Sequence, residues 1–216
     1  MPTGPGLWDG KEPVEPLQRT WKPWLMTRCD QFRPEPPPAL DSAECQEELA
    51  LLKRINRSPT PSQRTIATNF ATKSLDFIWD PSYALVNRER LSVPREVRLL
   101  ASFAALYVDA LIAAYDAKCL YWRLRPSMAD PTIVPFIPLP NHPAYVSNAA
   151  IIASVVARLV GYMFPQEATY WRYLGEEAGL SRIYGGIHYP SDERVGNQMG
   201  KRLGALAIQR DQRNGS

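Results

Sequence analysis

Hydrophobic residues recur at helical spacing along most of the chain after residue 41. In the stretch "SAECQEELALLKRINR", over 42–57, apolar residues repeat every three to four positions, as on one face of a helix. Asp41, followed three residues later by Glu44, predicts a capping box at the start of this helix. Strand-like alternation of polar and apolar residues is not sustained anywhere, and no internal repeat is present. The pattern therefore predicts an all-α protein.

The same spacing predicts further helices, and polar or proline residues mark their ends. Ser147 would cap a helix that follows a proline-rich loop over 126–146, and Ser191 or Asp192 would cap the last one. Pro126 would end a long helix, which we expect at the centre because apolar residues almost encircle it. We therefore expect a helical bundle of about six or seven helices. They would span 42–57, 61–80, 82–90, 94–125, 148–164, 166–180 and 193–210.

Glycine recurs every four residues in the last predicted helix, at Gly196, Gly200 and Gly204. Residues at this spacing lie on one face of a helix, so the three glycines form a flat stripe. The stripe predicts close packing against a neighbouring helix.

The first 41 residues differ in composition from the rest. They hold nine of the 21 prolines and three of the six tryptophans. Proline removes backbone donors and fixes φ, which predicts an irregular arm, and the tryptophans indicate that the arm packs on the body. We therefore divide the chain into an arm over 1–41 and a helical domain over 42–210.

Composition and charge exclude several classes of protein. The chain has 216 residues, of which 45% are hydrophobic, and this suits a single domain with a real core. Its net charge of +3 comes from 25 basic and 22 acidic residues without a dense basic run, so nucleic acid is not an expected partner. Three cysteines without zinc-like spacing support neither a disulfide framework nor a cysteine-rich metal site.

The sequence also bears on location. No basic start followed by an apolar stretch is present at the N-terminus, and the longest clean apolar run, "AAIIASVVA", is too short to span a membrane. We therefore expect a cytoplasmic protein without a membrane span.

Several residues of the second half could together bind an anion. Lys118 and Arg125 lie seven residues apart in the long predicted helix, and burial of two cations there would need an anion. Ser147 begins a helix, which leaves the amides of Asn148 and Ala149 unpaired, and such amides bind phosphate-like oxyanions.

The stretch "SRIYGGIHYPSD" adds a cation and a reactive imidazole. Arg182 is a third cation, and His188 is a potential nucleophile or ligand. Asp192 could accept a hydrogen bond from the other imidazole nitrogen and fix the tautomer.

The three pieces occur in a fixed order: "KCLYWRLRP", then "HPAYVSNAA", then "SRIYGGIHYPSD". This arrangement resembles the superfamily of vanadium-dependent haloperoxidases and type 2 phosphatidic-acid phosphatases (PAP2). It is most similar to the soluble bacterial haloperoxidase-like branch, in "DAK", "RP", "PFIPLPNHPAY" and "EEAGLSRIYGGIH". The resemblance covers roughly residues 36 to 208.

The resemblance implies a role for each motif residue. His188 would be the phosphorylated nucleophile of a phosphatase or the axial ligand of vanadium in a peroxidase, and Asp192 would orient it. A small molecule would be the substrate, with vanadate as cofactor or phosphate as ligand. The groups that would hold the oxygens of phosphate or vanadate are Lys118, Arg125, Arg182, Ser147 and the Asn148 amide.

The middle motif departs from the family pattern. Pro-Ser-Gly-His is usual there, whereas this chain has Val-Ser-Asn-Ala, so Ala149 stands where the family has an acid/base histidine. General acid–base help of this kind is worth about 10²- to 10⁴-fold in rate. His142 lies earlier in the loop and is expected to be structural. Tyr145, Tyr184 or water are candidates to replace the missing acid.

Three functions stay open on this basis. The first is a haloperoxidase-like enzyme that is weakened or altered by Ala149, and the second is a phosphatase or diphosphate-processing enzyme that uses His188. The third is a repurposed oxyanion-binding protein without turnover. Haloperoxidases of the family are commonly longer and contain two helical bundles, whereas this chain has room for one. A homodimer would supply the second bundle.

Overall fold

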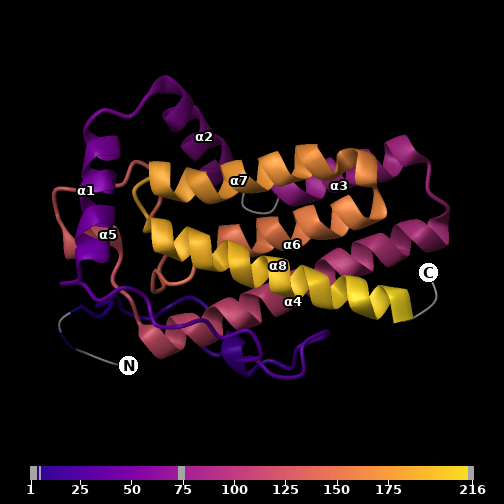
Figure 1. Cartoon of the computed structure of the whole chain (residues 1–216), viewed down its shortest axis with the longest axis horizontal. Helices are drawn as coiled ribbons and strands as arrows, with labels where there is room; N and C mark the ends of the chain where they lie inside the picture. The colour runs from indigo at the N-terminus through magenta and orange to yellow at the C-terminus, as the bar shows by residue number, and fades with distance from the viewer. Residues whose placement is uncertain (1–3, 5, 73–75, 214–216) are drawn as a thin grey trace.

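The computed structural model describes residues 4, 6–72 and 76–213, and this part of the chain is helical, without a β-strand. It confirms the predicted all-α class and shows an elongated bundle of helices, preceded by an arm with one 3₁₀ turn, η1 (Gln18–Thr20) (Figure 1). The α-helices are α1 (Ala43–Arg57), α2 (Pro61–Thr72), α3 (Asp76–Glu89), α4 (Val93–Tyr121), α5 (Pro126–Ala129), α6 (Asn148–Met163), α7 (Ala168–Tyr184) and α8 (Pro190–Arg213); a second 3₁₀ turn is η2 (Pro165–Glu167).

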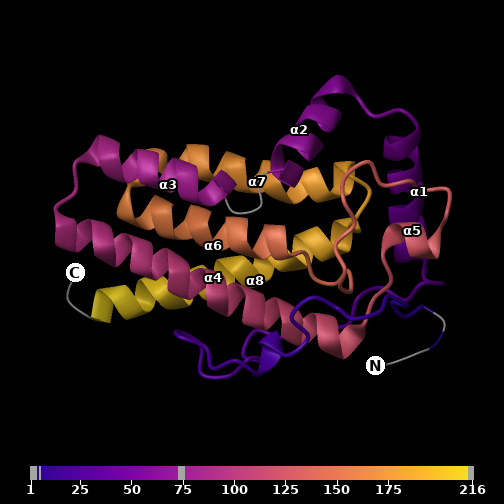
Figure 2. The ribbon, with the colours of Figure 1, turned by 180° about the vertical axis from the view of Figure 1, so that it is seen from behind.

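Helix α6 occupies the middle of the bundle, in contact with α4, α7 and α8 (Figures 1 and 2). Most of its residues are buried, because small and β-branched side chains alternate along "NAAIIASVVARLVGYM". The sequence had placed the long helix, α4, at the centre. Instead, α4 covers one side of α6 and exposes Val93 and Val97 at its N-terminal end.

The glycine stripe of α8 packs against α6, as predicted. A Cβ atom on Gly196 would lie 2.9 Å from the backbone oxygen of Ser147, and one on Gly200 would collide with the backbone oxygen of Ile151. The two helix backbones therefore touch directly along this face, and the contact fixes the N-terminus of α6 beside the first turn of α8.

Helix α4 ends four residues earlier than predicted. Trp122 takes a left-handed conformation with φ of 50° and caps the helix by donating its N–H to the carbonyl of Lys118. The arm causes this end: the Trp8 N–H donates to the carbonyl of Trp122 at 2.7 Å, and Leu7 forms a single β-bridge with Arg123. Arg125 consequently lies beyond the helix, not on its surface two turns after Lys118.

Other predicted boundaries are also wrong: the helix predicted over 61–80 ends at Thr72 as α2, and α7 continues to Tyr184 instead of ending at residue 180. Ser42, not Asp41, caps α1, because the serine hydroxyl accepts the N–H of Cys45 at 3.2 Å. Helix α3 continues through Pro81, since its later residues Leu85 and Val86 are buried in the core and offset the lost hydrogen bond. Pro190 begins α8, a favoured first position for proline, so the predicted caps Ser191 and Asp192 lie inside its first turn.

The arm runs along α4, and buried carboxylates of α4 hold it there (Figure 2). Asp109 accepts the backbone N–H groups of Trp24, Leu25 and Met26 at 2.7 to 2.8 Å. Asp116 accepts two hydrogen bonds from Arg33. The arm is therefore tied to the same helix that carries Lys118.

By length and composition alone, α4 is the one helix of the described residues that could cross a membrane. Of its most apolar window, 44% is buried inside the protein, and core helices of soluble proteins pass the same test. The sequence predicts no membrane span from its longest apolar run, which lies in α6, and that argument does not cover α4.

Candidate functional site

A cavity of about 330 Å³ lies where the C-terminus of α7, the N-terminus of α6 and the preceding loop meet. His188, Arg182, Asn148 and Ala149 line it, and so does His142. These residues come from segments that are far apart in the sequence, and His142 and His188 are separated by 46 positions. The structure thus places four of the predicted site positions around one hollow.

The loop between α7 and α8 presents His188 to this cavity. Gly186 makes the turn that leads to it, with φ of 77°, which a residue with a side chain rarely adopts. His188 is almost fully buried; its Nδ1 lies 2.9 Å from Asp192 Oδ2 and its Nε2 lies 3.0 Å from Arg125 Nη1. Asp192 accepts a hydrogen bond from the Nδ1–H group, so the lone pair of the ring is on Nε2.

The charge state of His188 follows from its surroundings. Burial and then the charge of Arg125 lower its pKa to about 3, although Asp192 opposes the shift. His188 is therefore a neutral imidazole at physiological pH, with its proton fixed on Nδ1. A neutral imidazole with its lone pair on Nε2 is the form that attacks phosphorus or binds a metal oxyanion, once Arg125 no longer donates to that nitrogen.

Asp192 is fully buried in the first turn of α8. Besides His188, its carboxylate accepts hydrogen bonds from Arg123 Nη1 at 2.8 Å and from the Tyr189 N–H at 3.1 Å. Burial alone would raise the pKa of Asp192, but Arg123 and the hydrogen bonds from His188 and Tyr189 hold it below its usual range. The carboxylate is thus ionised.

Arg123 and Glu48 were missed by the sequence analysis. Arg123 pairs with Asp192 and with Glu48, at 2.8 and 3.2 Å, and stacks 3.7 Å above the ring of Tyr189. Glu48 also accepts hydrogen bonds from the N–H and hydroxyl of Ser191. A signal for Glu48 did exist, because it occupies a position on the apolar face of α1, three residues after buried Cys45.

Arg125 joins the two histidines. It is fully buried: Nη1 contacts His188, Nη2 lies 3.0 Å from His142 Nδ1, and carbonyls of His142 and Ile187 accept its remaining hydrogen bonds. Burial lowers the pKa of Arg125 to about 10, so it remains a cation at neutral pH. Within the described residues no charged side chain lies in hydrogen-bonding distance of Arg125, because both imidazoles are neutral, and this leaves its positive charge available to an anion.

Lys118 is directed away from the cavity. Its ammonium donates to the carbonyls of Pro143, Ala144 and Val146 at 2.6 to 3.0 Å, which uses all three of its N–H groups. Burial and then the charge of Arg125 lower its pKa well below the ordinary value. In this arrangement Lys118 fixes the loop before α6, and direct oxyanion binding by it stays a prediction.

Ser147 begins α6 as predicted, with its hydroxyl accepting the Ala150 N–H at 3.4 Å. Its own N–H donates to the carbonyl of Asp192 at 3.1 Å, which links the two helix starts of the site. The Asn148 side chain carries a buried Oδ1 without a hydrogen-bond partner in the described residues. Ala149 follows at the cavity wall and offers no polar group.

Arg182 approaches the cavity from the last turn of α7. Its Nη2 donates to the carbonyl of Phe70 at 2.8 Å, and burial lowers its pKa. Its other guanidinium nitrogens make no hydrogen bond within the described part of the chain. Arg182 therefore brings a cation to the hollow, and Arg125 lies buried behind the two histidines that line it, while Asp192 is already paired with Arg123.

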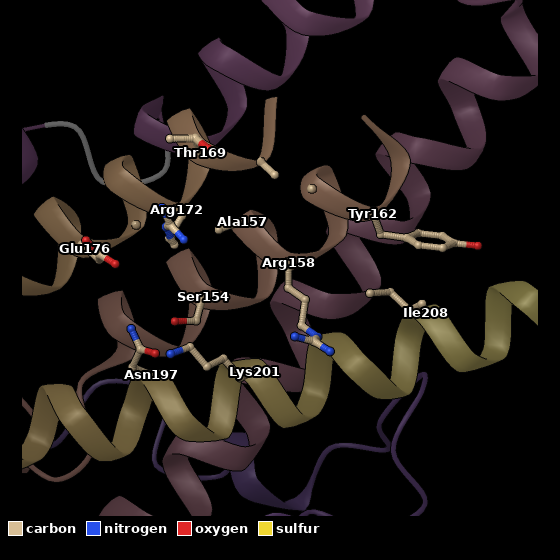
Figure 3. Close-up of a pocket in the computed structure, with 13 residues that line it drawn as sticks. Ser154, Ala157, Arg158, Tyr162, Thr169, Arg172, Glu176, Asn197, Lys201 and Ile208 are labelled. Carbon is tan, nitrogen blue, oxygen red and sulfur yellow. The ribbon is translucent and has the colours of Figure 1, made fainter. Parts of the chain in front are cut away.

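A second hollow of about 420 Å³ lies between α6, α7 and α8, away from both histidines. Arg158, Arg172 and Lys201 extend toward it from the three helices (Figure 3). All three are exposed to solvent, and Glu176 stands among them. The hollow lacks the buried imidazole and ionised carboxylate that distinguish the cavity at His188.

Comparison with known proteins identifies the fold. Residues 165–215 match the family model described as the VCPO second helical-bundle domain. The structure resembles those of the first bacterial vanadium-dependent iodoperoxidase (TM-score 0.85, 21% identity, 97% of this chain) and of a holo-type bacterial vanadium-dependent chloroperoxidase (0.83, 16%, 98%). No protein of curated function matches the chain in sequence.

The fold extends to a phosphatase. The first transmembrane PAP2-type phosphatidylglycerolphosphate phosphatase from Bacillus subtilis matches with a TM-score of 0.56 and 18% identity, over 81% of this chain and 89% of the phosphatase. By contrast, the chain spans 62% of the iodoperoxidase and 57% of the chloroperoxidase.

Proposed function

Because the chain shares the fold of the vanadium haloperoxidases and of a PAP2-type phosphatase, we propose that it is an enzyme of this superfamily. It binds a vanadate- or phosphate-like oxyanion in the cavity at His188, and we place it nearest to peroxide-dependent halide oxidation or a derived reaction. The observation that carries the proposal is the neutral His188, whose Nδ1 proton is held by Asp192 while Nε2 lies beside Arg125 at the cavity.

The residues present fit a tetrahedral oxyanion. Arg125 and Arg182 supply two cations, and the side-chain amide of Asn148, whose buried Oδ1 has no partner in the described residues, supplies a donor once its terminal group is turned. Arg125 would exchange its contact with His188 for one with the anion, which frees Nε2. Donors directed at the oxygens in this way stabilise the charge that builds up on them.

In the haloperoxidase reading, vanadate bound to His188 Nε2 would supply the Lewis-acid activation of peroxide. The chain's own residues then have three tasks. Asp192 keeps the His188 proton on Nδ1, the arginines would hold the oxygens of the anion, and the apolar wall of Tyr107, Leu111 and Ile152 limits access of water. At position 149 no group is present to move a proton, so the rate is weakened or the reaction altered.

The second candidate is hydrolysis of a phosphate ester with His188 as nucleophile. The His188–Asp192 pair favours it, because this pair prepares a nucleophile by itself. The chain also spans 89% of the PAP2-type phosphatase but only about 60% of each haloperoxidase. The third candidate, an oxyanion-binding protein without turnover, shares the binding site and differs only in its lack of reaction.

Binding of orthovanadate and phosphate, measured by calorimetry, tests the shared part of the proposal. Arg182→Ala should weaken both by about 10- to 100-fold, since one charge-assisted contact is worth about 1.5–3 kcal/mol. Arg172→Ala is the matched control: it removes an arginine from the same helix, but one that extends toward the second hollow (Figure 3), and should leave both affinities unchanged. Equal effects of the two variants, or no binding by the unaltered protein, would reject the site.

Activity separates the three candidates. Bromination of an activated diketone with vanadate, bromide and peroxide supports the haloperoxidase reading, and Ala149→His should raise its rate. Hydrolysis of 4-nitrophenyl phosphate without vanadate supports the phosphatase reading. Binding without either reaction leaves the oxyanion-binding protein as the function.

A further inference from the structure

The cavity contains a second imidazole, that of His142, which the sequence analysis had regarded as structural. His142 is 9% exposed and lines the cavity together with His188, Arg182 and Ala149. It therefore lies in the same hollow as the alanine that replaces the family's acid/base histidine. The two candidate tyrosines do not line this cavity, and the hydroxyl of Tyr145 donates to the carbonyl of Glu35 at 2.8 Å.

The contacts of the His142 ring leave one nitrogen for a ligand. Nδ1 lies 3.0 Å from Arg125 Nη2 and 3.1 Å from the carbonyl of Pro143, and the ring packs beside Tyr115 with 5.8 Å between the ring centres. Nε2 makes no hydrogen bond to any residue that the structure describes. Both the orientation of the ring and a vacant nitrogen are thus provided by the protein.

The two partners of Nδ1 suit two protonation states. Burial and then the charges of Lys118 and Arg125 lower the pKa of His142 well below its ordinary value, and Nδ1 accepts a hydrogen bond from Arg125. When an oxyanion draws Arg125 toward itself, Nδ1 can instead carry a proton donated to the carbonyl of Pro143. The negative charge of the ligand then favours the imidazolium, with Nε2–H as a second donor.

We propose that His142 donates the proton to the leaving oxygen of a phosphate ester, in place of the imidazole absent at Ala149. The inference rests on the phosphate-ester function proposed above. His188 Nε2 forms a bond to phosphorus, the bond from phosphorus to the leaving oxygen breaks with its electron pair on that oxygen, and the oxygen takes the proton from His142 Nε2. Neutral His142 then takes a proton from water, whose oxygen displaces His188 from phosphorus and releases phosphate.

Leaving-group dependence tests this role directly. 4-Nitrophenyl phosphate has a good leaving group that needs little protonation, whereas phenyl phosphate needs a proton. In His142→Gln, kcat/KM for phenyl phosphate should fall by about 10²-fold or more, and the fall for 4-nitrophenyl phosphate should be at least tenfold smaller. The ratio of the two rates reports on the acid, and a merely structural role would lower both rates together.

A rescue variant makes the test specific. Adding Ala149→His to His142→Gln places an imidazole at the family's usual position and should restore most of the lost activity with phenyl phosphate. Tyr184→Phe is the control, since this tyrosine does not line the cavity, and it should leave the ratio unchanged. Phosphate affinity, measured for each variant, reports on whether the site is still folded.

The outcomes distinguish the inference from the function beneath it. Equal losses with both esters, or none with either, in a His142→Gln protein that binds phosphate overturn the role of His142 alone. A wild-type protein that binds phosphate but cleaves neither ester overturns the phosphatase function and this role together. A wild-type protein that does not bind phosphate overturns the oxyanion site itself.

Discussion

Asp192 connects the reactive imidazole with the ion pairs behind it. One carboxylate oxygen accepts from His188 and the other from Arg123, which also pairs with Glu48. All four side chains are buried. In such a network the Coulomb attraction mainly offsets the cost of desolvating the charges, so the intact network adds little net stability. Removal of one partner is costly, because it leaves the other charge buried and unpaired.

Arg123→Met should therefore lower the free energy of unfolding by about 3–5 kcal/mol, because it leaves the Asp192 charge buried with less compensation. Urea denaturation at pH 7 measures this. Arg194→Ala is the control, since its ion pair with Glu44 at 2.8 Å is 55% exposed on both sides and should contribute less than about 1 kcal/mol. Similar losses in the two variants would contradict a buried network around Asp192.

His188 gives the stability a defined pH dependence. Its folded pKa, about 3, lies below the value near 6.5 of an unfolded histidine, so between these pH values the unfolded state binds one more proton. The free energy of unfolding should then rise as pH increases across the range from 3 to 6.5, by about 5 kcal/mol from His188 alone over its full titration. Urea denaturation at several pH values from 4 to 7 gives the free energy of unfolding as a function of pH. In His188→Asn the slope of this curve should correspond to about one proton fewer taken up on unfolding. An unchanged slope would refute the neutral, buried state of this imidazole.

The sequence indicates which residues form the site better than it indicates where their side chains point. The spacing of Arg182, His188 and Asp192 anticipated a cation, an imidazole and a carboxylate that the structure places together. It could not show that Lys118 donates to loop carbonyls, because that depends on the path of residues 143–146. Arg123 was missed for the same reason: its partner Glu48 is 75 positions away.

At the scale of elements, the contact between α6 and α8 holds the site. It brings the start of α6, with Ser147, against the first turn of α8, with Asp192. The contact depends on glycine to different degrees along the stripe. At Gly200 an added Cβ would collide with a backbone oxygen of α6, whereas at Gly204 it meets only side-chain atoms of Arg158, of which Cβ and Cδ are nearest at 3.1 Å.

Gly200→Ala should consequently lower the free energy of unfolding by about 1–3 kcal/mol, because the two backbones must separate. Gly204→Ala, one turn later, should cost less than Gly200→Ala, since alanine favours the helix and the contact at 3.1 Å is with a side chain and not with the backbone. Thermal unfolding of both variants measures the difference. Equal effects would mean that the glycines contribute only their helix propensity.

Helix existence was predictable and helix ends were not, and the reasons are physical. The 3.6-residue period marks buried faces such as that of α6, whereas ends depend on partners remote in sequence. Pro126 indicated only the last position at which α4 could end. The actual end at Tyr121 depends on Leu7 and Trp8, which bind the backbone of the next two residues.

At the scale of the whole molecule, the arm acts as a strap along α4, from Trp8 at its C-terminal end to the backbone held by Asp109 nearer its middle (Figure 2). The composition predicted that the arm would pack through its tryptophans, but only Trp8 is buried, whereas Trp21 and Trp24 are 45% and 69% exposed. The composition did not predict that buried carboxylates would fasten the arm. Asp109 and Asp116 lie seven residues apart on one face of α4, which is the only trace of this in the sequence.

Asp109→Asn tests the strap. An uncharged amide with a single acceptor oxygen cannot hold three backbone N–H groups, so the free energy of unfolding should fall by at least about 1.5–3 kcal/mol, the value of one charged hydrogen bond. Hydrogen exchange should show the amides of residues 24–26 losing protection while those of α6 keep theirs. Gln31→Ala removes an exposed contact in the same arm, to the Thr27 N–H at 2.8 Å, and should change stability by less than about 1 kcal/mol. If residues 24–26 stay protected in Asp109→Asn, the arm is held by its apolar side chains and not by this carboxylate.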